Sequence, residues 1–193
     1  MADRYPSRRI SCAVLSLAVL LLTACSGETK PEVEYALPDS FCGVQIGKEV
    51  IKPFFPPGSK LTKSETGGDL VSGKYSSGCD YLVDDGAPTL MVSTFFHEDV
   101  QTARQIAEGR AQRFGDGDTR ITVAASGDAA SYSRGAVAVA ECPGYPSDTD
   151  DLPRESFSVE IVAYYPKDLS KQGEALTQLV RKIVPIVSKA NNC

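Results

Sequence analysis

Residues 89–96 read TLMVSTFF, a run rich in β-branched and aromatic side chains that is typical of a β-strand. His97, Glu98 and Asp99 follow, and residues 100–114 then place apolar side chains at helical spacing. Asp99 is suited to cap that helix, because its carboxylate can accept hydrogen bonds from the free N–H groups at a helix start. The segment predicts a strand over 89–96 and a helix over 100–114.

A similar order of patterns occurs near the C-terminus. Residues 157–165 (FSVEIVAYY) alternate for most of their length, and Asp168 precedes a helix whose apolar residues form one stripe. We predict a short helix within residues 47–52 and further strands at 61–65, 70–75, 81–83, 120–124, 129–132 and 135–142.

The ranges above give four strand candidates on either side of the middle helix; reduced to three on each side, the order is α-βββ-α-βββ-α, and it has two explanations. It could reflect two αβββ units plus a C-terminal helix. Alternatively, the same residue types could recur only because each strand of an antiparallel sheet that is followed by a helix needs them at the boundary. In both cases the predicted class is α+β, an antiparallel sheet with helices packed on one face.

Three local features refine this prediction. Phe54 and Phe55 stand between prolines and form either part of the core or an exposed loop; burial is favoured, since large apolar side chains are usually buried. Asp84-Asp85-Gly86 predicts a β-hairpin turn, in which the glycine can take a positive φ. Pro185 should kink the last helix or end it early.

The first 24 residues have the pattern of an export signal. Three arginines precede an apolar run at residues 10–22, and Leu22-Thr23-Ala24-Cys25 is a lipobox. The run is shorter than the roughly 20 residues that span a bilayer. We therefore expect residues 1–24 to be removed as a lipoprotein signal peptide. Cys25 would then carry a thioether-linked diacylglycerol, with acyl chains such as palmitate, on the extracytoplasmic face of the cell membrane.

The export route stays open. Ser7-Arg8-Arg9 resembles the start of a twin-arginine signal, but the bulky apolar residues that usually follow are missing. The general secretory route and the twin-arginine route both fit the sequence.

The mature chain divides into a tether and one domain. Residues 25–40 comprise the acylated cysteine and a polar spacer, and residues 41–193 are predicted to form a single α+β domain. Removal of residues 1–24 takes away three of the 20 basic and one of the 25 acidic side chains, which leaves the mature chain with a formal charge of −7. Such a domain is a poor partner for nucleic acid, because long-range repulsion opposes its approach.

Four cysteines remain in the domain: Cys42, Cys79, Cys142 and Cys193. An even number in an exported chain predicts two disulfides, with three connectivities. We favour Cys42–Cys79 and Cys142–Cys193, because each closes a loop of about 40–50 residues, worth about 4 kcal/mol in the chain-entropy model. A metal or redox site is disfavoured, since the sequence has no C-x-x-C pair.

The inventory of catalytic motifs is sparse, and no cofactor is expected. His97 is the only histidine, and the sequence names no partner for it. Ser126 lacks both outer glycines of a G-x-S-x-G elbow and is interpreted as part of a turn. One local acid cluster lacks the spacing of a calcium loop and is interpreted as a solvated loop; it comprises Asp148, Asp150, Asp151 and Glu155.

Short motifs carry a family resemblance. After the lipobox and spacer, Cys42-Gly43 opens a short helix, Gly78-Cys79 opens a strand, and Tyr81 follows two residues later. The chain thereby resembles uncharacterised actinobacterial lipoproteins of a domain-of-unknown-function family, in which the aromatic after the second cysteine is often Trp. The match covers mainly residues 41–114. The resemblance implies a small α+β domain outside the cell membrane with no established activity, and it supports the Cys42–Cys79 pairing.

Three functions compete at this point. The leading hypothesis is a non-enzymatic binding or interaction module, held at the membrane by its lipid and engaging an unknown envelope protein or ligand. The second is a carrier of a small apolar ligand or lipid, with a pocket lined by Phe54, Phe55, Phe95, Tyr164 or Tyr165. The third is a cell-envelope hydrolase that uses His97 or the acidic loop.

Overall fold

The computed structural model describes residues 33–114, 120–146, 153–166 and 172–193. The leader, Cys25, Asp168 and three members of the acidic loop lie outside the described residues, so the predictions made for them are not addressed by the fold. No helix in the described ranges is long and apolar enough to cross a membrane.

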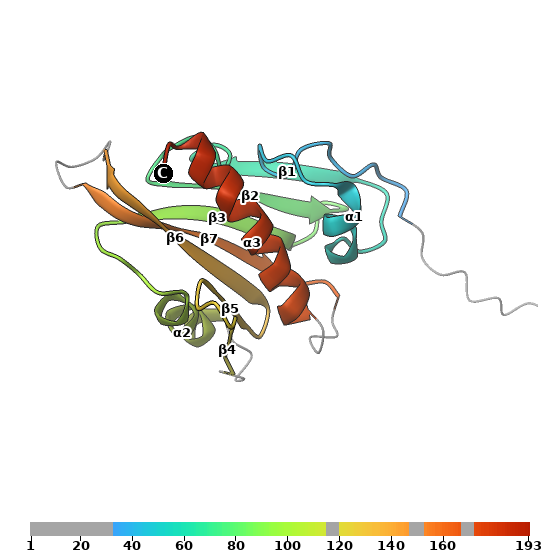
Figure 1. Ribbon diagram of the computed structural model, residues 1–193. Coiled ribbons are helices and arrows are strands. Elements are labelled where there is room, and N and C mark those ends of the chain that lie inside the picture. The colour runs from blue at the N-terminus through green and yellow to red at the C-terminus, as the bar shows by residue number, and fades with distance from the viewer. Residues whose placement is uncertain (1–32, 115–119, 147–152, 167–171) are drawn as a thin grey trace, which may run out of the picture. The chain divides into compact units, whose positions relative to one another are not determined.

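A seven-stranded antiparallel sheet forms the framework of the domain (Figure 1). Its spatial order is β1-β2-β3-β7-β6-β5-β4, so the two strongest strand patterns of the sequence, β3 and β7, pair at its centre. The strands are β1 (Leu61–Thr66), β2 (Ser76–Val83), β3 (Pro88–His97), β4 (Thr122–Val123), β5 (Ala129–Tyr132), β6 (Gly135–Tyr145) and β7 (Arg154–Ala163). The predicted mixed α+β class with an antiparallel sheet is confirmed.

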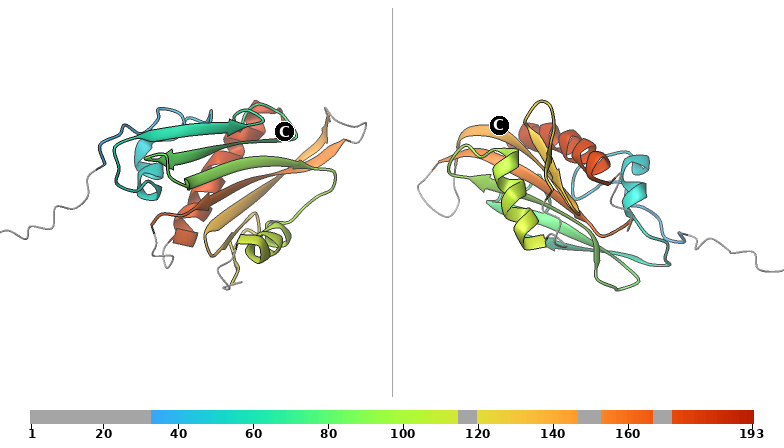
Figure 2. Two further views of the ribbon diagram at one scale, coloured as in Figure 1. Left: turned by 180° about the vertical axis from the view of Figure 1, so that it is seen from behind. Right: turned by 90° about the horizontal axis from the view of Figure 1, so that it is seen from below.

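Helices cover both faces of this sheet (Figure 2). In β6, Ala136 and Ala138 pack in one apolar cluster with α3 (Gln172–Ala190), whereas Val137 belongs to a second cluster with α2 (Ala103–Phe114). Because alternate residues of a strand point to opposite faces, α3 and α2 lie on opposite sides. The expectation that the helices share one face is therefore wrong. The reason is that β6 and β7 carry apolar side chains on both faces, and each face needs a cover.

This arrangement also bears on whether the chain contains two αβββ units. Adjacent antiparallel strands are interchanged by a two-fold axis perpendicular to the sheet, and such an axis would keep the following helices on one face. Here α2 follows β3, α3 follows β7, and their side chains pack on opposite faces. The recurrence is better explained by boundary chemistry than by two αβββ copies.

The larger cluster lies beneath α3 and the short helices α1 (Lys48–Ile51) and η1 (Lys52–Phe54). Phe54 and Phe55 are both buried in it, which confirms the favoured prediction. Phe96 and Phe157 meet across the central strands with their ring centroids 5.7 Å apart. The core therefore sits between this layer of helices and the central strands.

Helix α2 begins later than predicted. Its first residue is Ala103, and Thr102 and Gln105 form a capping box. The Thr102 hydroxyl accepts a hydrogen bond from the Gln105 N–H (3.2 Å), and the Gln105 side chain accepts one from the Thr102 N–H (3.0 Å). The predicted Asp99 cap is therefore wrong, and Thr102 caps the helix instead.

Other local predictions differ from the fold. Residues 70–75 form turns rather than a strand. At the β2–β3 turn, Asp84 and Asp85 take positive φ (54° and 55°), and Gly86 does not. Helix α3 continues through Pro185 to Ala190, so an early end is wrong; this proline lies on the exposed side, where water can serve the carbonyl group that loses its N–H partner.

Candidate functional site

Two disulfides link the domain, as expected: Cys42–Cys79 and Cys142–Cys193. These are the pairs favoured from loop length. The first ties the turn at Phe41–Val44 to β2, with 5.8 Å between its Cα atoms. The backbone N–H of Cys42 donates to the Tyr81 hydroxyl (2.8 Å), and the Tyr81 ring stacks on Phe41 at 5.3 Å. The residues that carry the family resemblance thus meet in one buried structural unit.

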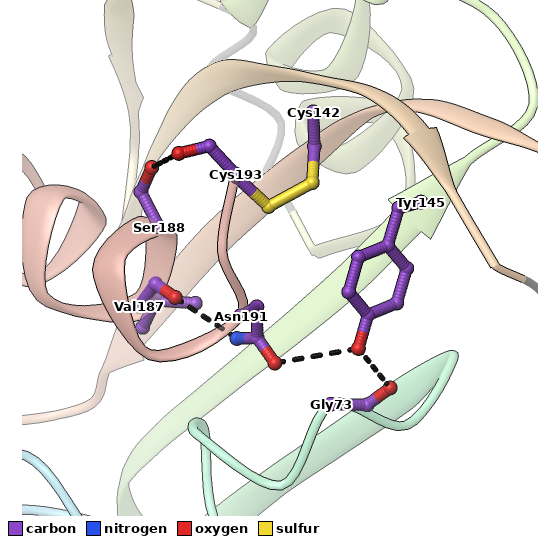
Figure 3. The surroundings of a disulfide bond; sticks show 7 residues. All are labelled: Gly73, Cys142, Tyr145, Val187, Ser188, Asn191 and Cys193. Carbon is purple, nitrogen blue, oxygen red and sulfur yellow. Dashed lines mark hydrogen bonds between the residues drawn. A yellow bond between two sulfur atoms is a disulfide. The ribbon is translucent and has the colours of Figure 1, made fainter.

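The second disulfide joins Cys142 in β6 to Cys193, which follows α3 (Figure 3). Close to it, the Tyr145 hydroxyl donates to the carbonyl oxygen of Gly73 (2.8 Å) and lies 3.4 Å from the side-chain oxygen of Asn191. The Asn191 amide in turn donates to the Val187 carbonyl (2.9 Å). The end of β6, the β1–β2 connection and the C-terminus are therefore held together here, which is a structural role.

His97 ends β3 and contacts a serine that the sequence did not single out. Its Nε2 lies 2.9 Å from the Ser158 hydroxyl oxygen, across the β3–β7 pair. Burial lowers the pKa of His97, and Ser158 is only 1% exposed. A nucleophilic serine must touch its substrate, so in this conformation the contact serves packing rather than acyl transfer.

A buried ionic cluster fastens α2 to the sheet. One carboxylate oxygen of Glu160 lies 2.9 Å from Arg110 Nε, and the other accepts a hydrogen bond from the Tyr132 hydroxyl (2.7 Å). Burial raises the pKa values of Glu160 and Tyr132. The Arg110 guanidinium also lies over the Phe95 ring at 5.2 Å. The ion pair and the hydrogen bond join α2, β5 and β7, so we assign the cluster a structural role.

An apolar recess of about 520 Å³ opens at the end of the sheet where β3 starts and β7 stops. Three separate segments build it: the η1–β1 connection, the β2–β3 turn with the start of β3, and the residues that follow β7. The lining residues are Pro56, Ala87, Pro88, Thr89, Met91, Tyr164 and Tyr165. The Tyr164 N–H donates to the Thr89 carbonyl (2.9 Å), which fixes one wall against another.

Tyr164 is the exposed aromatic of this recess. Its side chain is 40% exposed, and the Arg134 guanidinium lies 5.7 Å from its ring centroid. Among the described residues that line the recess, none is charged. Such a lining suits an apolar ligand oriented by a few polar groups.

The recess agrees only in part with the pocket suggested by the sequence. Tyr164 and Tyr165 line it, whereas Phe54 and Phe55 are core residues and Phe95 faces α2 through Arg110. Met91 and the two prolines were missed. They come from segments that are distant in sequence, so no periodic pattern could have grouped them.

A second recess, of about 680 Å³, lies between α3 and the β4–β5 hairpin. Most of its lining residues are polar, with apolar atoms exposed among them, and its Arg181 is already paired with Asp128 at 3.1 Å. In the described part of the chain, no three His, Cys, Asp or Glu side chains converge to hold a metal ion. Glu155, the described member of the acidic loop, lies in β7.

The apolar recess is thus the strongest candidate for a ligand site. Comparison of the chain with protein-family models, with curated proteins and with solved structures gave no match. The function is therefore argued from the geometry of this recess.

Proposed function

We propose that this protein is a lipid-anchored, extracytoplasmic binding module without enzymatic activity, and that the apolar recess is its binding site. The observation that carries the proposal is the exposed Tyr164 ring beside an apolar hollow of about 520 Å³. Apolar surface in a concave site gains free energy when a ligand displaces water from it.

The anchor is supported by the lipobox at residues 22–25 and by the resemblance to actinobacterial lipoproteins. Two acyl chains on Cys25 would hold the protein stably, at about 0.8 kcal/mol per buried methylene. The two disulfides are compatible with an oxidising compartment outside the cytoplasm.

A binding role is favoured over hydrolysis because of where the polar groups lie. The Ser158–His97 contact is remote from the recess: His97 ends β3, whereas Pro88 at its start lines the recess. Buried Ser158 also offers no nucleophile at a surface.

A carrier of a small apolar ligand is the second candidate function. The apolar lining, with Met91 and Tyr165, favours it. A carrier must shield its cargo from water, so it would retain lipid after release from the membrane, whereas a module that engages a partner in place would not.

Site-specific photo-crosslinking in intact cells tests the proposal. A benzophenone amino acid replaces Tyr164 in one full-length variant and Tyr75 in the control. Tyr75 is a matched position, since it is 45% exposed and also has an arginine over its ring, at 4.8 Å. We expect a discrete crosslinked envelope component from position 164 and none from position 75. Equal crosslinking from both positions, or none from either, would contradict the assignment of the binding site.

A further inference from the structure

The apolar recess lies at the end of the domain where the tether enters. Val33, the first described residue, forms a bridge with Gly58, and the Glu34 N–H donates to the Gly58 carbonyl (2.9 Å). The Tyr35 hydroxyl donates to the carbonyl of Pro56, and Pro56 is itself a wall of the recess. The segment that leads back to Cys25 therefore leaves from beside the recess.

Chain length limits how far this end can lie from the anchor. Eight residue steps separate Cys25 from Val33, so the fully extended chain spans at most about 28 Å. That is shorter than the thickness of a bilayer with its headgroups, roughly 40 Å. If Cys25 is acylated, the recess is tethered close to the lipid surface.

Exposed apolar side chains occur at this same end. Val33 is 42% exposed and Tyr164 is 40% exposed. Tyrosines sit well at a membrane–water interface, because the ring is apolar and the hydroxyl is polar. Both side chains therefore add exposed apolar surface at the end of the domain that carries the recess.

We propose that the recess receives an acyl chain of a phospholipid in the membrane that holds the anchor. This inference rests on the proposed lipid anchoring. A methylene chain suits the apolar lining formed by Met91, Pro88 and Ala87, which contains no charged side chain among its described members. The contact is apolar rather than ionic, because the mature chain has a formal charge of −7 and gains nothing from an anionic surface.

The test uses the full-length mature protein purified from its own membranes and reconstituted into phosphatidylcholine vesicles. A small fraction of the phosphatidylcholine carries a diazirine at the end of one acyl chain. Vesicle flotation first reports whether the protein is anchored. After illumination, mass spectrometry maps the labelled peptides. We expect label on the peptides with Met91, Tyr164 and Tyr165, and little on the peptide with Tyr75.

Two variants fill the recess and one serves as the matched control. Ala87 is an exposed turn residue at the recess, so Ala87→Trp adds bulk and Ala87→Glu adds charge without disturbing the core. Ala125 is an exposed residue of the turn between β4 and β5 and does not line the recess, so Ala125→Trp is the control. Excluding two methylenes corresponds to a loss of more than about tenfold in labelling. We expect this loss in both Ala87 variants and no change in the control.

The outcomes separate the two proposals. Protein that does not float refutes the lipid anchor itself. Protein that floats but is unlabelled at the recess, or whose labelling survives both Ala87 substitutions, overturns the acyl-chain inference and leaves the anchored binding module standing. If labelling at the recess survives in the Ala87→Trp variant alone, the acyl chain inserts nonspecifically, and the acyl-chain inference is again overturned.

Discussion

At the scale of single residues, the motif positions turn out to be supports for the fold. Tyr81 combines three roles: it accepts the Cys42 N–H, stacks on Phe41, and meets Phe55 edge-on with 5.6 Å between ring centroids. The sequence indicated the cysteine pair and the aromatic, but not that a hydroxyl would be needed. That need arises because Cys42 is fully buried and the Tyr81 hydroxyl is the acceptor of its N–H.

Replacing Tyr81 by phenylalanine should lower the free energy of unfolding by about 1–3 kcal/mol, because a buried N–H group loses its acceptor. Urea denaturation of both proteins measures the change. Tyr75→Phe, at an exposed position, is the control and should stay within about 0.5 kcal/mol of the parent. A Tyr81→Phe variant as stable as the control would contradict this role.

His97 should make stability depend on pH. Burial lowers its pKa below the ordinary value of 6.5, so the unfolded chain binds more protons than the folded one as pH falls below that value. The free energy of unfolding should therefore decrease as pH drops from about 7 towards 5. His97→Gln keeps a side-chain nitrogen for Ser158 and removes the titration, so its melting temperature should fall less over this range. Parallel melting curves for the two proteins would show that His97 does not contribute.

At the scale of elements, strand positions were predictable and helix placement was less so. Strand β5 was predicted to the residue. Strand β3 was predicted to within one residue at each end, because its β-branched and aromatic side chains are a local signal. Which face a helix covers is not local. It depends on β6 and β7 being apolar on both faces, and this becomes evident only once both strands are placed inside the sheet.

Helix α2 approaches the sheet closely because its inner face is lined by alanines at helical spacing, Ala103, Ala107 and Ala111, all of them buried. Ala107→Leu should therefore overpack this interface and lower the free energy of unfolding by about 1–3 kcal/mol. Glu108→Leu places the same side chain at the next, exposed position and should change stability by less than about 0.5 kcal/mol. Equal effects of the two substitutions in urea denaturation would argue against close packing of α2.

At the scale of the whole molecule, two long loops are closed by disulfides. Cys142–Cys193 spans 51 residues, and the chain-entropy model gives about 4 kcal/mol for such a loop. The double variant Cys142→Ser, Cys193→Ser should therefore unfold at a lower urea concentration, with a loss of about 2–5 kcal/mol. A loss below about 1 kcal/mol would contradict this contribution and would mean that the packing of α3 and the Tyr145 contacts suffice to hold the C-terminus.

The candidate site was only half predictable from the sequence. The aromatic pair Tyr164 and Tyr165 was identified, because two adjacent aromatic residues end the predicted strand over 157–165. Pro56 and Met91 were not, since they join the recess only through the pairing of β3 with β7 and the packing of the η1–β1 connection. A recess formed by three segments has no signature in any one of them.

Everything proposed for this molecule depends on the acyl chains at Cys25, because they place the recess beside a membrane. Intact-mass spectrometry of the protein extracted from its own cells tests this most directly. The account predicts a chain that begins at Cys25 and carries the added mass of a diacylglycerol with long acyl chains. A chain that still contains residues 1–24, or one that begins at Cys25 without acyl mass, would contradict it.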